Sequence, residues 1–348
     1  MNGDKTVSPG ESVTVAGESV VVKVESERPR RRSNLGSLIL LGLLAASVMM
    51  NLLLIASTAI NDPSSNAVRQ VHRDGSKGAS DKLAVIQFTG TIMPPFTDRW
   101  IEQIRDAVKD DTVKGVLLEI DSPGGLVADS HQLYHELQKL RAEKPIYVAM
   151  KRMAASGGYY IAMGAGPDAR VFAEPTTWTG SIGVILPRYN ASELASKIGV
   201  KTEPFVTGPL KGSLSPFRDL RDDEVQVWEA IVDDSFQRFI SVIADNRDNL
   251  DSDAVRALAT GQVYTSNQAL ENGLIDQTGF VEDALTALAD SLSLTEYEVV
   301  NYASPKGLLE VLMGSTQAPP SIMDQLMEAS VPRAFYYCSW NPVLPVHQ

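Results

Sequence analysis

A single serine stands among small residues in the segment MAASGGYYIAMG, residues 153–164. Ser156 is followed by Gly157 and Gly158 and is expected at a join between a strand and a helix. There the first amides of the helix would lie near its oxygen, and the glycines would leave room for a substrate. These features suit a nucleophile, although a serine before a helix also serves as an N-cap, and this stretch alone leaves both readings open.

A nucleophilic serine needs backbone N–H groups that stabilise the oxyanion formed when it attacks a carbonyl. The segment EIDSPGG, residues 119–125, ends a predicted buried strand in a glycine turn that allows close approach of a ligand. Such a turn suits an oxyanion amide, whereas Pro-Gly-Gly by itself indicates only a turn.

The serine also needs a base that accepts its proton. The four histidines are His72, His131, His135 and His347. His131 and His135 stay open as partners because a catalytic triad is defined by geometry and not by chain order, but they are expected on the body of a helix. They are four residues apart without a third ligand at a recognisable spacing, so we expect no metal site and no cofactor.

Lysine is the alternative base, and it acts as one where burial lowers its pKa enough to leave a neutral amine near pH 7. Lys211 lies in TGPLKGSLSPFR, residues 207–218, a loop whose Ser213 and Ser215 could orient an amine. Lys151 is nearer to Ser156 in the sequence but is expected at the end of a strand. Lys211 is therefore the preferred base.

Composition narrows the class of protein. The chain has 348 residues and a formal charge of −12, the wrong sign for a nucleic-acid-binding surface. Its one cysteine, Cys338, excludes an intrachain disulfide framework. We expect a folded protein that does not bind nucleic acid.

An uncharged run from Ser33 to Asn61 exceeds the ~20 residues that cross a bilayer. Four arginines precede it and Asp62 follows, so the positive-inside rule places the N-terminus in the cytoplasm and the rest of the chain on the outer side. The run is too long for a typical signal peptide, which favours a retained single-pass anchor over cleavage near Ala59.

These patterns divide the chain into five parts. Residues 1–33 are predicted as a disordered cytoplasmic tail, 34–60 as a transmembrane anchor, 61–80 as a polar linker, 81–314 as the catalytic domain and 315–348 as a C-terminal tail. The tail ends in the apolar run AFYYCSWNPVLPV, which is expected either to pack on an oligomer or to occupy a site as a pseudo-substrate.

Strands and helices alternate in the catalytic domain, which predicts an α/β fold with a parallel sheet. Strands are predicted at 83–92, 115–120, 145–150, 170–173, 181–185, 201–206 and 296–303, and helices at 100–108, 126–140, from 156, at 191–198 and at 222–247.

Together, DSPGG, AASGGYYIA, TGSIGV and LKGSLSPFR, in this order, resemble the protease IV type of signal-peptide peptidases over Leu83 to Leu292. The resemblance implies a Clp protease or crotonase-like fold of stacked β-β-α units and a membrane-bound Ser/Lys peptidase. Where that family has Gly-Arg-Val, this chain has Gly261, Gln262 and Val263, which puts one local contact in doubt.

By this resemblance, Ser156 is the nucleophile, Lys211 the general base, and Gly125 and Gly157 the oxyanion amides. It further implies homo-oligomers with active sites near subunit interfaces, and signal peptides or other membrane-associated peptides as substrates. Tyr159, Tyr160 and Ile185 are hypothetical groove residues, and core positions suit the two tyrosines better.

Two other classes of function stay open. A non-catalytic membrane scaffold would keep the fold, and the presence of both Ser156 and Lys211 argues against it. A crotonase-like enzyme acting on acyl-CoA would also use glycine turns, but the acidic charge and the apolar anchor argue against it.

Overall fold

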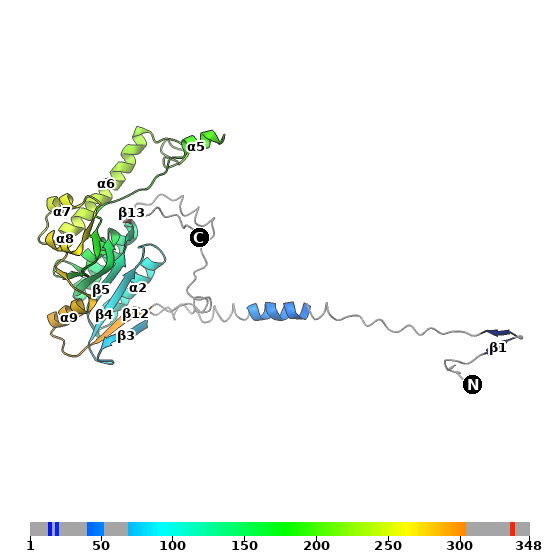
Figure 1. Cartoon of the computed structure of the whole chain (residues 1–348), viewed down its shortest axis with the longest axis horizontal. Coiled ribbons are helices and arrows are strands. Elements are labelled where there is room, and N and C mark those ends of the chain that lie inside the picture. Colours follow the sequence, from blue (N-terminus) through cyan, green and yellow to red (C-terminus); the bar gives the residue numbers. More distant parts are fainter. Residues whose placement is uncertain (1–12, 16–17, 21–39, 52–68, 304–334, 338–348) are drawn as a thin grey trace. The chain divides into compact units, whose positions relative to one another are not determined.

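The computed structural model describes residues 13–15, 18–20, 40–51, 69–303 and 335–337. Residues 1–61 and 62–348 form separate units, and each is considered by itself. The predicted serine, lysine and glycines all belong to the second unit, whose helices and strands are shown in Figure 1.

A sheet of nine strands forms the centre of the second unit, and it contains the predicted parallel core. Its order is β10-β9-β7-β5-β4-β12-β3, with β8 beside β7 and β11 beside β8. The pairs β12–β4, β4–β5, β5–β7, β7–β8 and β7–β9 are parallel. The strands are β3 (Arg69–Gly75), β4 (Lys82–Thr89), β5 (Val113–Ser122), β7 (Ile146–Ala155), β8 (Val171–Ala173), β9 (Trp178–Gly180), β10 (Val263–Thr265), β11 (Gln277–Thr278) and β12 (Glu298–Ala303).

Helices cover both faces of this sheet. The described helices are α2 (Phe96–Lys109), α3 (Val127–Glu143), α4 (Gly157–Ala162), α5 (Ser192–Lys197), α6 (Asp222–Ala244), α7 (Ser252–Leu258), α8 (Ser266–Glu271) and α9 (Val281–Ser291). The larger apolar core contains residues of α2, α3, α4 and α6, whereas α9 packs on the other face with Leu83, Leu117 and Phe172. Burial on both faces explains why β4 and β5 are continuous apolar runs.

Three predicted segments differ from the structure. The polar stretch 69–75, expected in a linker, forms the edge strand β3, which pairs antiparallel with β12. Conversely, the strands predicted at 181–185 and 201–206 are not formed, since Ile185 is only a single bridge residue and the other positions have no strand structure. The apolar side chain of Phe205 is fully exposed, so the pattern that predicted a buried strand there does not mark a core within this chain.

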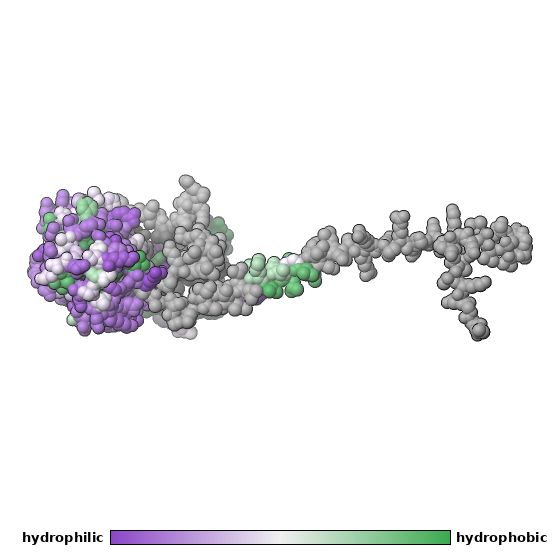
Figure 2. Space-filling model, turned by 90° about the horizontal axis from the view of Figure 1, so that it is seen from below, coloured by the Kyte–Doolittle hydropathy of each residue, from purple (hydrophilic) through white to green (hydrophobic). Residues whose placement is uncertain are grey.

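In the first unit, β1 (Val13–Val15) and β2 (Glu18–Val20) form an antiparallel pair. Residues 40–51 are helical, and their surface is largely apolar (Figure 2). No helix among the described residues has both the length and the apolar character needed to cross a membrane. Most of the predicted anchor at 34–60 lies outside the described residues.

An ion pair between a buried arginine and a partly exposed aspartate joins the residues after α6 to the loop before β11. Arg247, whose side chain is 7% exposed, donates two hydrogen bonds to the Asp276 carboxylate, at 2.7 and 3.0 Å, and two to the carbonyl of Gly273. Asp276 also accepts a hydrogen bond from the N–H of Val171 at the start of β8, so the pair fixes the loop before β11 next to the paired strands β8 and β11 of the sheet.

Arg247→Met is expected to lower the free energy of unfolding by about 2 kcal/mol, because it leaves the Gly273 carbonyl and the Asp276 carboxylate without their hydrogen-bond donor. Arg152→Met is the matched control. Its side chain is 80% exposed although it also pairs with a carboxylate, that of Asp121. We expect the control to cost under about 1 kcal/mol in urea unfolding, and equal costs for the two variants would contradict the assignment.

Candidate active site

Ser156 lies at a sharp turn between β7 and α4, as the sequence predicts. Its backbone has φ 55° and ψ −115°, a conformation that side-chain-bearing residues rarely adopt. Its N–H donates to Gly180 at 2.7 Å, and its carbonyl accepts from Tyr160 at 2.9 Å. Strained backbone of this kind is concentrated at functional sites, where the surrounding structure holds it in place.

The Ser156 side chain does not cap the helix that it precedes. The residue is 1% exposed, and its Oγ has no hydrogen-bond partner within the described residues. Since most buried hydroxyls are hydrogen-bonded, this oxygen calls for an explanation other than capping. The geometry therefore favours the nucleophile over the N-cap.

The two glycines predicted to hold an oxyanion lie together beside Ser156. A Cβ placed on Gly157 would be 3.1 Å from the Gly125 nitrogen, and one placed on Gly124 would be 2.7 Å from the Gly157 nitrogen. Gly124 has φ +100°, which only glycine adopts without strain. The turn thus brings the Gly125 and Gly157 backbones into contact next to the serine.

A short C-terminal strand covers this turn. β13 (Phe335–Tyr337) pairs antiparallel with β6 (Gly124–Leu126), and Tyr336 lies opposite Gly125. Figure 1 labels β13 close to the sheet. The described part of the apolar tail therefore pairs with the glycine turn, while the neighbouring tail residues lie outside the described range.

The two tyrosines after Ser156 have different surroundings. Tyr159 is buried and donates to the carbonyl of Leu274 at 2.7 Å, so it is a core residue. The Tyr160 hydroxyl lies 2.7 Å from Nδ1 of His131, and its ring stacks on that of Tyr336. Burial, followed by the charge of Arg238, lowers the pKa of His131, so the imidazole is held neutral as a partner of Tyr160.

Lys211 lies on a well-anchored but exposed loop. Arg218 donates to the carbonyl of Gly212 at 3.1 Å and pairs with Glu224 at the start of α6, while Arg221 donates to the carbonyl of Pro209 at 2.9 Å. The hydrogen bond from Arg218 lowers the pKa of Glu224 to about 2, so this buried carboxylate is ionised at neutral pH. The SPFR segment that follows the lysine therefore fixes its loop to α6.

The structure does not bring Lys211 to Ser156 of the same chain. Trp228 of α6 donates to Ser213 of the lysine loop, whereas Phe239 of α6 contacts Tyr160, next to the serine. Eleven residues of helix separate these two contacts, which is about 16 Å along the axis. Figure 1 shows the loop and α5 beyond the far end of α6, away from the sheet.

The other bases considered from the sequence have different partners. Lys151 lies 3.6 Å from the Glu119 carboxylate, and His72 lies 2.9 Å from that of Glu298. His135 is exposed on α3. No group of three potential metal ligands occurs within the described ranges.

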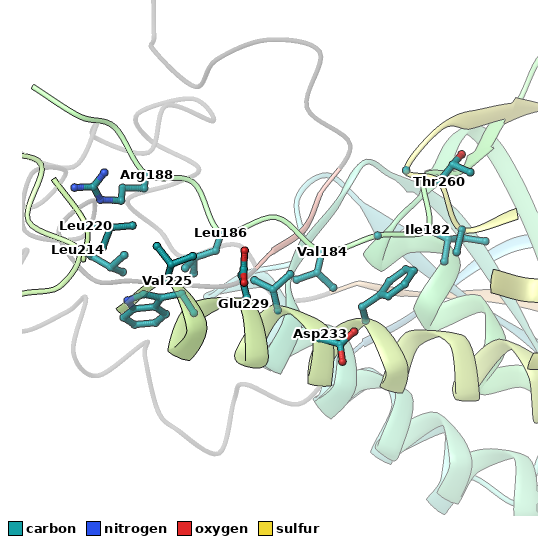
Figure 3. Close-up of a pocket in the computed structure, with 16 residues that line it drawn as sticks. Ile182, Val184, Leu186, Arg188, Leu214, Leu220, Val225, Glu229, Asp233 and Thr260 are labelled. Atoms are coloured by element: carbon teal, nitrogen blue, oxygen red, sulfur yellow. The ribbon is translucent and has the colours of Figure 1, made fainter. Parts of the chain in front are cut away.

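An apolar groove of about 580 Å³ runs along α6 from the strand end near Ser156 to the lysine loop. One end of the groove is at Ile182, two residues after Gly180, whose carbonyl accepts a hydrogen bond from the Ser156 N–H. The other end is at Leu214 and Leu220. Figure 3 shows Val184 and Leu186 facing α6 across it. Ile185 is partly exposed and does not line this groove.

Arg218→Met is expected to loosen the lysine loop, because it removes the link between Gly212 and the ionised Glu224. Amide hydrogen exchange of residues 209–216 should become about tenfold faster or more at neutral pH. Arg256→Met, which replaces an exposed arginine of α7, is the control and should leave this exchange unchanged. Unchanged protection in Arg218→Met would show that the other contacts suffice to hold the loop.

The fold and the serine turn define a class: an α/β protein with a buried serine at a glycine-lined turn. The sequence pattern of Clp protease matches residues 76–193, and that of peptidase family S49 matches residues 138–295. The latter range includes Ser156, Gly157 and Lys211.

Curated relatives agree with this class. A protein named putative signal peptide peptidase SppA from Enterococcus faecium is 43% identical over 204 residues, 58% of each chain. A putative protease, slr0021, from Synechocystis sp. is 36% identical over 247 residues, 70% of this chain and 87% of that protein. Protease 4 from Salmonella typhi is 33% identical over 237 residues, 68% of this chain and 38% of that protein. The chain belongs to peptidase family S49, a family of serine-type peptidases.

Proposed function

We propose that this protein is a membrane-anchored serine endopeptidase that degrades signal peptides, and other membrane-associated peptides, after their release from preproteins. The observation that carries the proposal is the buried Ser156, whose strained backbone and unpartnered Oγ lie beside the amides of Gly125 and Gly157. β13 pairs antiparallel with β6 here, which supports the proposal that an extended peptide fits against this turn.

In the proposed mechanism, the neutral amine of Lys211 accepts the proton of Ser156 Oγ, and Oγ forms a bond to the peptide carbonyl carbon. The N–H groups of Gly125 and Gly157 stabilise the resulting oxyanion. Collapse breaks the C–N bond, and the Lys211 ammonium returns the proton to the leaving amine. Water, deprotonated by the same lysine, then releases the acyl group from Ser156.

Lys211 would reach Ser156 from a second copy of the chain. Ser156 Oγ has no partner within the described residues, and the lysine loop is held far along α6 from its own serine. We call residues 185–221, which include α5 and the lysine loop, the arm. The arm exposes large apolar side chains, namely Tyr189, Leu194, Ile198, Phe205 and Leu210. Such a surface favours contact with another subunit.

The relatives named for signal-peptide and general proteolysis support peptides as the substrate class. The groove along α6 is lined mainly by apolar side chains, and one end is at Ile182, two residues after the Gly180 carbonyl that accepts from the Ser156 N–H, so it suits the apolar core of a signal peptide. The uncharged run at 34–60, preceded by arginines, supports a single-pass anchor with a cytoplasmic N-terminus and the catalytic domain outside.

The full chain in detergent, treated with a fluorophosphonate probe and an apolar fluorogenic peptide, tests the proposal. We expect labelling of Ser156, identified by mass spectrometry, together with hydrolysis of the peptide. A protein that hydrolyses an acyl thioester but no peptide would instead be a crotonase-like enzyme. Labelling of another residue would overturn the assignment of the nucleophile.

A further inference from the structure

Two carboxylates lie on the α6 wall of the apolar groove. Glu229 and Asp233 both line it, and because they are four residues apart they lie on one face of the helix, about 6 Å from each other along its axis. In Figure 3 they lie on α6 beside Val184 and Leu186. Both residues are exposed. The middle of a mainly apolar groove therefore has a negative wall.

These two carboxylates are not neutralised by a cation of the described part of the chain. There, the Asp233 carboxylate accepts a hydrogen bond only from the side-chain amide of Gln237, at 3.0 Å, and the Glu229 carboxylate accepts none. Arg256, whose guanidinium lies over the Phe236 ring, donates to Gln237 and not to a carboxylate of the groove. Unpaired carboxylates beside apolar side chains favour a ligand that is apolar and also carries a positive charge.

The carboxylates lie a few peptide residues away from the proposed cleavage site. Phe239 contacts Tyr160, next to Ser156. Asp233 precedes Phe239 by six residues and Glu229 precedes it by ten, which places them about 9 and 15 Å away along the helix. An extended peptide advances about 3.3 Å per residue, so these distances correspond to about three to five residues from the cleaved bond.

The sign of the charge reverses at the far end of the groove. Arg188 lines this end with Leu214 and Leu220, as Figure 3 shows. Its guanidinium donates to the backbone carbonyls of Ser215 and Arg218, which carry no net charge. A positive ligand group is therefore attracted to the middle of the groove and repelled from its far end. This order of charges selects the position of a basic residue as well as its presence.

From this charge pattern we infer that the groove binds the part of a signal peptide at which a basic residue borders the apolar core. Glu229 and Asp233 pair with the basic side chain, three to five residues from the cleaved bond, and the apolar lining contacts the residues between them. Signal peptides have this order, since a positively charged segment precedes the apolar one. The inference rests on the proposed function and narrows its substrate class.

The test uses the full chain in a non-ionic detergent and quenched apolar peptides that differ only in Lys, Gln or Glu at the fourth residue from the cleaved bond, placed on each side in turn. On one side, kcat/KM should be about threefold to tenfold higher for Lys than for Gln, the effect of one or two exposed ion pairs, and lowest for Glu. The preference should fall below about twofold in ~1 M salt. A lysine moved to about the seventh residue, toward Arg188, should not be preferred.

Charge variants of α6 test the two carboxylates directly. Glu229→Gln combined with Asp233→Asn should bring the Lys and Gln peptides to within about twofold of each other, and Glu229→Lys should make the Glu peptide better than the Lys peptide. Asp222→Asn combined with Asp234→Asn is the matched control. It changes the net charge of the same helix by the same amount at exposed carboxylates that do not line the groove, so it should keep the preference for Lys.

The outcomes separate the inference from the proposed function. Cleavage without a preference for Lys, or with the same preference in the Glu229 and Asp233 double variant, would overturn the inference alone. A preference lost equally in the control would assign it to the overall charge of the protein and would overturn the inference as well. Absence of both cleavage and Ser156 labelling would overturn the proposed function.

Discussion

Ser156→Ala is expected to lower kcat/KM for peptide hydrolysis by roughly 10³- to 10⁶-fold, the range for loss of a nucleophile. It removes the only atom that forms the proposed acyl-enzyme, while the oxyanion amides and the substrate groove stay in place. Fluorophosphonate labelling should disappear with it.

The same substitution should leave stability unchanged or slightly increased. The Ser156 Oγ is buried without a hydrogen-bond partner among the described residues, so its removal breaks no bond and relieves the cost of burying a hydroxyl. Ser266 is a suitable contrast, because its buried hydroxyl donates to the carbonyl of Glu174. Ser266→Ala should lower the free energy of unfolding by about 1 kcal/mol and retain peptidase activity.

These two variants separate the site from the scaffold, since one loses activity without stability and the other loses stability without activity. Thermal unfolding and peptide turnover, measured on the same preparations, provide the comparison. If Ser156→Ala unfolded as readily as Ser266→Ala and kept its turnover, Ser156 would be an ordinary core residue and the nucleophile would lie elsewhere.

The neighbourhood of Ser156 could be predicted from the sequence because local features define it. A strand followed by Ser-Gly-Gly and a helix places the serine at a turn, and the glycines of the DSPGG segment allow the close backbone contact found at Gly124 and Gly125. The parallel sheet follows from the same local signals, since β4 and β5 are apolar runs buried on both faces.

Features that depend on distant segments could not be predicted in this way. The polar β3 is an edge strand, and its partner β12 begins more than two hundred residues later, so no local apolar pattern marks it. The apolar residues of 201–206 resemble a buried strand, but Phe205 and Val206 are exposed on the arm. Hydrophobic patterning cannot distinguish burial within a chain from burial against another copy.

The position of Lys211 is likewise determined by contacts with other segments of the chain and not by its local sequence. Its motif indicates a base, but the direction of its loop is set by Arg218, Glu224 and Trp228, which fix it to the start of α6. The sequence therefore predicts a serine and a lysine that would act together as a catalytic dyad. In the structure, the described residues of one chain do not bring these two side chains together.

Lys211→Ala is expected to lower kcat/KM by roughly 10³-fold or more, because Ser156 loses the group that takes its proton. The larger consequence concerns mixed assemblies. If the dyad forms across two copies, Lys211→Ala and Ser156→Ala subunits complement each other, since a serine of the first then meets a lysine of the second. Random mixing in equal amounts should restore about a quarter of wild-type activity, because half of the sites keep the serine and half of those face an intact lysine.

Co-expression of the two variants with different affinity tags, followed by purification through both tags, gives assemblies in which this fraction can be measured. Lys197→Ala, an exposed lysine of α5 on the same arm, is the control and should be fully active alone. Each dyad variant alone should stay inactive at any concentration. Mixed assemblies without activity would mean that Lys211 must reach the serine of its own chain, which requires its loop to move about 16 Å along α6, and the arm would then be a mobile part of one subunit.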